Sequence, residues 1–422
     1  MTTQLLRSNR NYRLLFSASA ISNLGDGISA LAFPWLATLI TRDPFLIALV
    51  AFATRLPWML FAIPAGVVID RTDRQRIMVR SDLTRLFLSF AVVMLIFAAP
   101  SMPLGDENTG ATGLILALSV IAFLLGTAEV FRDNAAQTVL PTLVDKRELE
   151  TANGQMWSME QIMGSFVGPP LAGVLIALAV PLPFAFDALM FGVAAMCVAM
   201  IAFPARTAER LPSGFWQDMK EGVVWLFRHR LILQLAVMLG FLNLFHIMTL
   251  TVLVLFSQEV LGLGAFGYGV LLTAGAAGGV VGGIICPYLS TRIGPQKSLL
   301  VALVVFPIAD LVIWQTTSSI LVGVALCFGM LAAVLWNVVT VSYRQRFIPD
   351  DLLGRVNAIY RFFGWGMMPI GALIGGAVVS LFDPSLGRIE ALRLPFLLAA
   401  LGNVALLVYA LIALRFPAPA SD

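Results

Sequence analysis

Long apolar stretches follow one another along almost the whole chain, separated by short polar segments. A membrane-spanning helix needs about 20 largely apolar residues, and twelve stretches are long enough. The predicted spans are 14–40, 45–69, 77–99, 112–131, 156–178, 182–203, 231–257, 267–289, 297–316, 319–343, 357–382 and 393–415. A membrane barrel would instead show alternating segments of about ten residues, which are absent from the sequence. The pattern predicts an all-α membrane protein with 12 transmembrane helices.

Composition supports this prediction, because 59% of the 422 residues are apolar and only 12% are charged. A soluble domain carries about 25% charged residues, so lipid must be the solvent for much of this surface. Lys and Arg concentrate in alternate loops, as cytoplasmic loops do, and the opposite loops keep only Arg42, Arg388 and Arg393. The distribution predicts that both termini are cytoplasmic.

The two halves of the chain resemble each other. The four residues beginning at Asn23 recur in degraded form at Asn243, and the five beginning at Gln137 recur at Gln345. The longest polar connection contains a predicted amphipathic helix over 217–230 that would lie on the membrane surface. The predicted domains are 1–203, a linker 204–230, and 231–422. Two pseudo-symmetric six-helix bundles are typical of secondary transporters.

A charged signature occupies the loop after the second span. It reads Gly66-Val-Val-Ile-Asp70-Arg71-Thr-Asp73-Arg74-Gln-Arg76. This resembles the Gly-x-x-x-Asp-Arg-x-Gly-Arg-Arg signature of the major facilitator superfamily, with Asp73 where that family usually has Gly. The resemblance implies a conformational latch in which Asp70 faces a helix N-terminus, whose dipole favours an anion. The arginines are expected to pair with carboxylates on neighbouring helices, namely Asp82, Glu129 and Asp133. The alternative is a cluster of charges that only orients the loop.

The fifth span contains a run of small residues and prolines, Gly164-Ser-Phe-Val-Gly168-Pro169-Pro170-Leu-Ala-Gly173. It resembles the Gly-x-x-x-Gly-Pro-x-x-Gly-Gly motif of antiporters in the same superfamily. Small residues four apart allow close helix packing, and proline removes a backbone hydrogen bond and kinks a helix. Packing alone is the alternative explanation. With the loop signature, the motif favours export over import.

Further stretches resemble one branch of the superfamily, which contains enterobactin exporters and macrolide or tetracycline efflux proteins. They are residues 24–29, 54–58, 140–144, 149–153 and 349–356. The resemblance implies proton-driven efflux across the cytoplasmic (inner) membrane of a bacterium.

Asp26 lies near the middle of the first span. An ionised side chain at the bilayer centre costs about 2.5–3.5 kcal/mol on insertion scales, so such a residue invites a functional explanation. A carboxylate that gains and loses a proton would suit proton-coupled transport. Arg55 in the second span is the expected counter-charge. The alternative is a static Asp26–Arg55 pair that only orients two helices.

Other polar residues within predicted spans are weaker candidates for proton coupling or substrate binding. His246 titrates near physiological pH and has Asn243 one turn before it, although a hydrogen-bonded structural histidine is the alternative. Glu160 is expected to face the cavity, and Asn337 and Trp336 could line it.

Two further acids are expected near the outer surface. Asp310 is close enough to that end of its span to reach the lipid headgroups, and Asp187 is placed to cap the sixth span.

These observations predict a secondary active transporter, a proton-coupled exporter of a drug-like compound or siderophore that works by alternating access. The alternatives are an importer or flippase of a metabolite or lipid, and a non-transporting sensor. Enzymatic motifs are absent from the sequence, and its three Cys and two His match no metal motif, so no cofactor is expected. The expected partners are an organic small molecule, protons and the lipid bilayer, without nucleic acid, and the expected state is a monomer.

Overall fold

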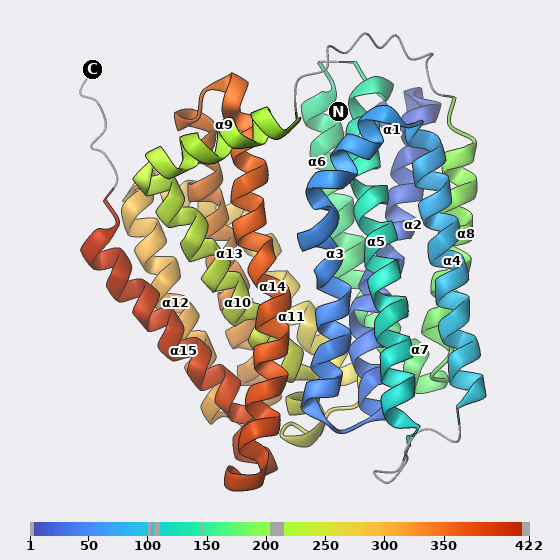
Figure 1. Cartoon of the computed structure of the whole chain (residues 1–422), viewed down its shortest axis with the longest axis vertical. Coiled ribbons are helices and arrows are strands. Elements are labelled where there is room, and N and C mark those ends of the chain that lie inside the picture. The colour runs from blue at the N-terminus through green and yellow to red at the C-terminus, as the bar shows by residue number, and fades with distance from the viewer. Residues whose placement is uncertain (1–3, 100–102, 105–109, 146, 203–214, 416–422) are drawn as a thin grey trace. The chain divides into compact units, whose positions relative to one another are not determined.

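The computed structural model describes residues 4–99, 103–104, 110–145, 147–202 and 215–415, and these residues are almost entirely helical (Figure 1). The helices of the N-terminal half are α1 (Gln4–Ser8), α2 (Arg10–Ile40), α3 (Pro44–Arg71), α4 (Arg74–Ala98), α5 (Ala111–Leu143), α6 (Leu149–Glu160), the π-helix η1 (Gln161–Val167), α7 (Gly168–Leu178) and α8 (Leu182–Ala199). The remaining helices are α9 (Phe215–Arg228), α10 (Arg230–Glu259), α11 (Ala265–Ile293), α12 (Pro295–Gln315), α13 (Ser319–Phe347), α14 (Asp350–Leu386) and α15 (Arg388–Ala413).

Each predicted span falls on a long helical segment, with α6, η1 and α7 together forming the fifth. Within the described residues, eleven segments are long and apolar enough to cross a membrane. The segment that falls short is α2, because it carries a row of serines together with Asp26. The largest difference in length is in α5, which was expected to end at 131 but continues to Leu143. Its last turns therefore place Arg132 and Asp133 in a helix and not in a loop.

The chain forms two compact units, the first comprising Met1–Ala208 and Gly262–Thr273 and the second Glu209–Leu261 and Ala274–Asp422. The same helix pairing occurs within each unit. In the first, α2 packs on η1 and α7, and α4 packs on α8. In the second, α10 packs on α14, and α12 packs on α15. The duplication inferred from short sequence matches is therefore also present in the tertiary contacts of each unit.

Glycines allow the closest of these helix contacts. A Cβ on Gly375 of α14 would lie 2.5 Å from the carbonyl oxygen of Met248 in α10, and one on Gly240 of α10 would lie 2.8 Å from the carbonyl oxygen of Phe363 in α14. Small residues at such contacts let helix backbones approach and gain dispersion energy, which drives helix association where lipid is the solvent.

The apolar core of the first unit includes Tyr12, Leu15 and Val139, all fully buried. The Tyr12 hydroxyl donates to Oε1 of Gln155 at 2.8 Å, which joins α2 to α6. An aromatic ring with a satisfied hydroxyl can be buried without a desolvation penalty.

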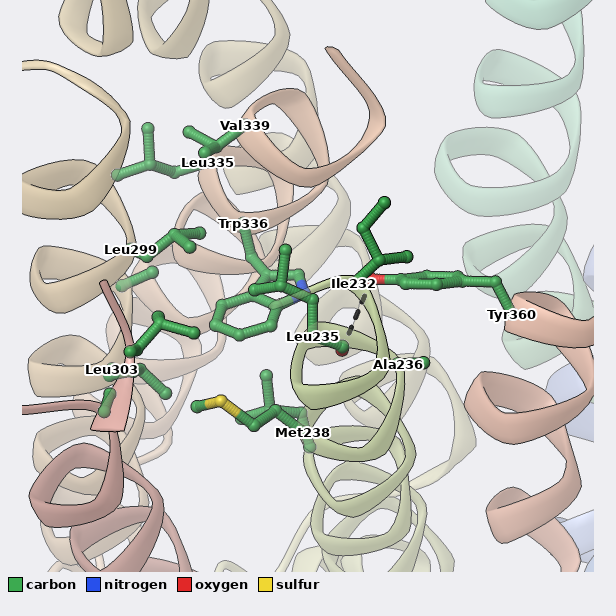
Figure 2. Close-up of a cluster of buried hydrophobic side chains, with 14 of the residues drawn as sticks. Ile232, Leu235, Ala236, Met238, Leu299, Leu303, Leu335, Trp336, Val339 and Tyr360 are labelled. Carbon is green, nitrogen blue, oxygen red and sulfur yellow. Dashed lines mark hydrogen bonds between the residues drawn. The ribbon is translucent and has the colours of Figure 1, made fainter. Parts of the chain in front are cut away.

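The second unit has its own core around Trp336 on α13 (Figure 2). Its indole packs among side chains of α10 and α12, including Leu235 and Leu303. Tyr360 of α14 closes the cluster by donating its hydroxyl hydrogen to the carbonyl of Leu235 at 3.3 Å. Trp336 is only 1% exposed, so the expectation that it lines a cavity is wrong.

The linker helix α9 agrees with the helix predicted over 217–230, and it packs on α10 and α14. Arg355 of α14 donates to Oε2 of Glu221 at 2.6 Å. The side chain of Arg355 also lies against Gly222, where an added Cβ would meet it at 3.1 Å. An ion pair and a close contact thus attach α9 to α14 within the second unit.

Candidate functional site

A row of polar side chains runs along one face of α2. Ser19, Ser22, Asp26 and Ser29 are separated by three or four residues, the spacing that places side chains on the same side of a helix. This face packs on α5 and α8, and each of the four side chains meets a charged group from another helix. The row explains how a helix in an apolar environment accommodates so many polar residues.

Arg85 on α4 is the main partner of this row. Its guanidinium forms an ion pair with Asp26 and donates to the Ser22 hydroxyl at 2.9 Å. It also lies 3.9 Å from the centre of the Phe191 ring on α8, within the range of a cation–π interaction. The Arg85 side chain is 3% exposed, whereas that of Asp26 is 23% exposed. The pair is therefore buried on its arginine side and partly open on its carboxylate side.

A second arginine, Arg132 on α5, extends the charged cluster. It donates to the Ser19 hydroxyl at 3.3 Å, and its Nε lies 3.6 Å from Oδ1 of Asp82, one turn before Arg85 on α4. A terminal guanidinium nitrogen of Arg132 also lies 3.5 Å from Oδ1 of Asp133, the next residue on α5. Asp82 is fully buried, and the same Oδ1 atom lies 3.8 Å from Arg85. The Asp82 carboxylate thus lies between the two arginines.

Three more charged residues surround this core. Glu129 on α5 interacts electrostatically with Arg85 and with Arg55 of α3, and it accepts a hydrogen bond from Trp58. Glu160, at the end of α6, interacts with Arg132. Together with Asp187, described below, we call these nine residues the charged cluster: Asp26, Arg55, Asp82, Arg85, Glu129, Arg132, Asp133, Glu160 and Asp187. It contains six carboxyl groups and three guanidinium groups.

The structure changes the predicted partner of Asp26. Arg55 was expected to be its counter-charge, but the guanidinium that meets Asp26 belongs to Arg85. Arg55 interacts instead with Glu129, because α3 packs on α5. The static Asp26–Arg55 pair considered as an alternative is wrong for the same reason.

Asp187 is also in a different environment from the one predicted. It lies in the second turn of α8, which begins at Leu182 and whose N-terminal cap, Pro181, makes no side-chain capping bond. Asp187 is 0% exposed, and its Oδ2 atom accepts a hydrogen bond from Ser29 at 2.5 Å. The expectation that it caps the helix at the outer surface is wrong, since it faces α2.

The glycine–proline motif of the fifth span produces the π-helix η1. Pro169 and Pro170 have no N–H to donate to the carbonyls one turn earlier, and the N–H of Gly168 bonds the carbonyl of Met163, five residues back. The predicted kink is thus a π-helical segment, a feature frequent at functional sites.

The same motif packs directly on α2 beside Asp26. A Cβ on Gly168 would lie 2.6 Å from Cα of Gly27, and one on Gly27 would overlap the carbonyl oxygen of Gly164. Only residues without a side chain allow this approach of the two backbones. At the far end of the motif, a Cβ on Gly173 would lie 2.7 Å from the carbonyl oxygen of Ala265 in the same unit.

The loop signature between α3 and α4 has a clear local structure. Asp73, which replaces the usual Gly, is the N-cap of α4 and accepts from the N–H groups of Gln75 and Arg76 at 2.9 and 3.3 Å. Arg74 donates to the carbonyl of Thr138 on α5 at 2.7 Å, and Arg76 is exposed, 3.5 Å from Asp73. Gly66 lies within α3, and an added Cβ there would meet no atom within 4 Å among the described residues, apart from the backbone of its own helix.

The expected latch partners lie elsewhere. The side chains of Asp70 and Arg71 are outside the described residues. Asp82 and Asp133 pair with Arg85 and Arg132 of the charged cluster, so the predicted pairing of these carboxylates with the loop arginines is not what the described side chains show. The reason is that α4 and α5 each contribute an arginine at the same depth as the carboxylates.

In the part of the chain that the structure describes, the two asparagine candidates of the second unit donate hydrogen bonds to backbone carbonyl groups and not to charged side chains. Asn243 on α10 donates to the carbonyl of Gly364 on α14 at 2.9 Å. His246 is exposed, and its carbonyl accepts from Thr249. Asn337 is exposed and bonds its own helix at Ala333. None of these three belongs to a charged cluster like that of the first unit within the described residues.

Asp310 was expected to reach the headgroups, but the structure gives it a protein partner. Nδ2 of Asn403 on α15 donates to its Oδ2 atom at 2.9 Å, and Asn403 is buried. Asp310 therefore belongs to the contact between α12 and α15.

Arg85, Arg132 and the serines of α2 are not among the residues predicted from the sequence. Their signal was present, since an arginine is rare in a span and Ser19, Ser22 and Ser29 share the helical spacing of Asp26. What was missing was a way to tell which helices would face one another.

The long helical segments of the described residues, the repeated pairing of helices within each unit and the charged cluster among the spans are typical of a multi-pass membrane transporter. The chain belongs to the transmembrane secretion effector family of the major facilitator superfamily, whose family model matches residues 5–422. It is a transporter and not an enzyme.

Named relatives agree with this assignment. The multidrug efflux pump Tap of Mycobacterium tuberculosis is 25% identical over 391 residues, covering 86% of this chain and 85% of the relative. Macrolide efflux protein A of Streptococcus pyogenes is 24% identical over 379 residues, covering 86% of this chain and 89% of the relative. A crystal structure of a point mutant of the nucleoside transporter NupG has a TM-score of 0.77 at 11% identity, covering 96% of this chain and 100% of that one. The last comparison supports the fold alone.

Proposed function

We propose that the protein is a proton-coupled exporter of a drug-like compound or siderophore, located in the bacterial inner membrane with both termini cytoplasmic. The observation that carries the proposal is the imbalance of the charged cluster, whose six carboxyl groups exceed its three guanidinium groups. The membrane orientation is supported by the concentration of Lys and Arg in alternate loops.

An excess of carboxyl groups among the spans has a direct chemical consequence, most of all for Asp82 and Asp187, which are fully buried. Ionising all six would leave uncompensated negative charge among membrane spans, where each unpaired charge is costly. The buried carboxyl groups of the cluster would avoid this cost by holding protons, or a cation could enter the cluster. Both possibilities suit an exporter that exchanges protons for an organic cation or an amphipathic compound.

Asp26 is the proposed coupling residue because it is the partly exposed member of a buried ion pair. Protonation of Asp26 would release Arg85, and Arg85 also holds Ser22 and lies over Phe191. A proton on α2 would thereby change the contacts of α2 with α4 and α8. Such a change of helix contacts is what alternating access requires.

Two further elements have proposed roles. Residues 66–76 would act as a conformational latch, with Arg74 holding the start of α4 against α5 through Thr138. The π-helix would act as a flexible joint beside Asp26. Export is favoured because the two named relatives are efflux proteins and because the motif of residues 164–173 resembles that of antiporters.

Transport assays in inverted membrane vesicles test this function. Ethidium, as a cationic dye, and radiolabelled erythromycin, as a macrolide, would be the probes under an imposed pH gradient. We expect uphill accumulation by the wild type that nigericin abolishes, since nigericin collapses the pH gradient. Asp26→Asn should retain downhill movement of the probe but lose uphill accumulation.

Asp310→Asn is the matched control, because it removes a carboxyl group of the second unit that lies outside the charged cluster. It should accumulate the probe as the wild type does. Uphill accumulation by Asp26→Asn at the wild-type level would exclude Asp26 as the coupling site. Accumulation that survives nigericin would exclude coupling to the pH gradient, and net movement in the opposite direction would indicate an importer.

A further inference from the structure

We propose that Asp187 is a second proton-binding site and that Arg85 exchanges its carboxylate partner between Asp26 on α2 and Asp187 on α8. The proposal rests on the proposed proton coupling and deepens it, because it names where a proton is held when Asp26 is ionised.

The first observation is the hydrogen bonding of Asp187. The residue is fully buried, its Oδ2 atom accepts one hydrogen bond from Ser29, and its Oδ1 atom has no donor among the described residues. An ionised carboxylate in such a site would lack both a cation in contact and enough donors, which is unfavourable by several kcal/mol. A carboxylic acid needs fewer donors, so the site suits the protonated form.

The second observation is an unused donor close by. Nε of Arg85 is buried without an acceptor among the described residues, while the terminal nitrogens of Arg85 bind Ser22 and Asp26. Arg85 and Asp187 also lie within electrostatic range of each other. Nε of Arg85 and Oδ1 of Asp187 would both gain a hydrogen-bond partner if the arginine turned toward α8.

The third observation is the geometry that would permit this turn. The guanidinium of Arg85 stacks on Phe191, which lies one turn after Asp187 on the same face of α8. On the α2 side the neighbour is Gly25, where an added Cβ would lie 2.9 Å from the Phe191 ring and 3.5 Å from Oδ1 of Asp187. A side chain at this position would occupy the space beside Phe191 and Asp187, and glycine leaves that space free.

The exchange conserves both protons and charge. In one state Asp26 is ionised, Arg85 binds it, and Asp187 carries a proton. When Asp26 binds a proton from the aqueous side, Arg85 moves to Asp187, and Asp187 releases its proton. The three groups have zero net charge in both states, so the exchange avoids an uncompensated buried charge.

The charged groups that face Asp187 from neighbouring helices are few. On α4 it is Arg85, which lies within electrostatic range of Asp187. On α2 the charged residue nearest in sequence to Ser29, the hydrogen-bond donor of Asp187, is Asp26. The α7 helix carries no charged residue, and α8 carries no charged residue other than Asp187 itself. The protonation of Asp187 should therefore depend mainly on the position of Arg85.

Infrared difference spectroscopy of the purified full-length protein tests the proposal without any substrate. The carbonyl stretch of protonated carboxyl groups is recorded between pH 4 and pH 10. One band should be absent from Asp187→Asn and present in Asp310→Asn, which is the matched control because it removes a different, partly buried carboxyl group. Ser29→Ala should shift the frequency of the same band, because this serine hydrogen-bonds that carboxyl.

The decisive measurement is the pH midpoint of the Asp187 band in two variants of its neighbours. In Asp26→Asn the freed arginine should pair with Asp187, so the midpoint should fall by about one to three pH units, a 10- to 1,000-fold loss of proton affinity. In Arg85→Gln the cation is gone, so the midpoint should rise or the band should persist to the highest pH. A structural disturbance would not produce opposite shifts, and the two variants keep the test valid if one of them fails to fold.

Either of two results would overturn the proposal: no band that depends on Asp187, or an Asp187 midpoint that is the same in Asp26→Asn as in the wild type. The infrared result is independent of transport. Loss of pH-driven accumulation in the vesicle assay would refute the proposed function and leave the Asp187 band to be judged by itself.

Discussion

Replacing Arg85 with methionine tests how strongly the charged cluster stabilises the first unit. Methionine keeps much of the length and apolar volume of the side chain but removes the ion pair with Asp26, the hydrogen bond to Ser22 and the contact with Phe191. Removing one partner of a buried ion pair costs about 3–5 kcal/mol, because the other charge stays buried and uncompensated. We expect a loss of this size in the free energy of unfolding, which is roughly 100- to 5,000-fold in the equilibrium constant.

The measurement is reversible unfolding in mixed detergent micelles with increasing dodecyl sulfate, followed by circular dichroism. The double variant Asp26→Asn with Arg85→Met should recover about half or more of the loss, because it leaves no unpaired charge at Asp26. The cost of Arg85→Met should also shrink as the pH falls, because a protonated Asp26 no longer needs a cation. A cost below about 1 kcal/mol, typical of an exposed pair, or a double variant no more stable than the single one, would refute the role assigned to Arg85.

Three further substitutions test the local structure. Gly27→Ala should destabilise the protein by about 1–3 kcal/mol, because the new methyl group meets the backbone of Gly164. Gly113→Ala is the control and should be neutral or slightly stabilising, because an added Cβ there has open space around it. Equal effects of the two substitutions in dodecyl sulfate unfolding would contradict the contact of Gly27 with Gly164. Asp73→Ala should cost about 1 kcal/mol and speed amide hydrogen exchange at the start of α4, and Asp73→Asn should restore both if the N-cap is responsible. Asn243→Ala should cost about 0.6 kcal/mol, a typical value for hydrogen bonds between membrane helices, and an unchanged unfolding midpoint would argue against its bond to α14.

The positions of the helices were largely predictable because each span carries its own apolar signal. A stretch of about 20 apolar residues is stable as a membrane helix whatever its neighbours are. The exceptions have local causes. The extension of α5 past 131 carries Arg132 and Asp133. Two consecutive charged residues are typical of a loop, and only their partners show that they lie in a helix. The π-helix η1 depends on Pro169 and Pro170, and the proline-rich sequence indicated a distortion without its type.

The candidate site was only partly predictable. Asp26 was singled out correctly as a charge in mid-span that needs a partner, but Arg85 is 59 residues away in the chain and Arg55 was the nearer choice in sequence. Asp187 looked like a helix cap because it lies near the start of a span. Its hydrogen bond with Ser29 joins residues 158 positions apart, and no local pattern indicates such a contact.

The sequence by itself determined the class of protein, the number and approximate bounds of the spans, the duplicated plan and the family signatures, because these depend on local composition and on short motifs. The tertiary structure alone decided which charges meet. Pairing depends on which faces of α2, α4, α5 and α8 pack together, and this is set by close contacts such as that of Gly27 with Gly168. A buried charge is stable only beside its partner, so the chemistry of this transporter resides in the helix packing rather than in any one segment.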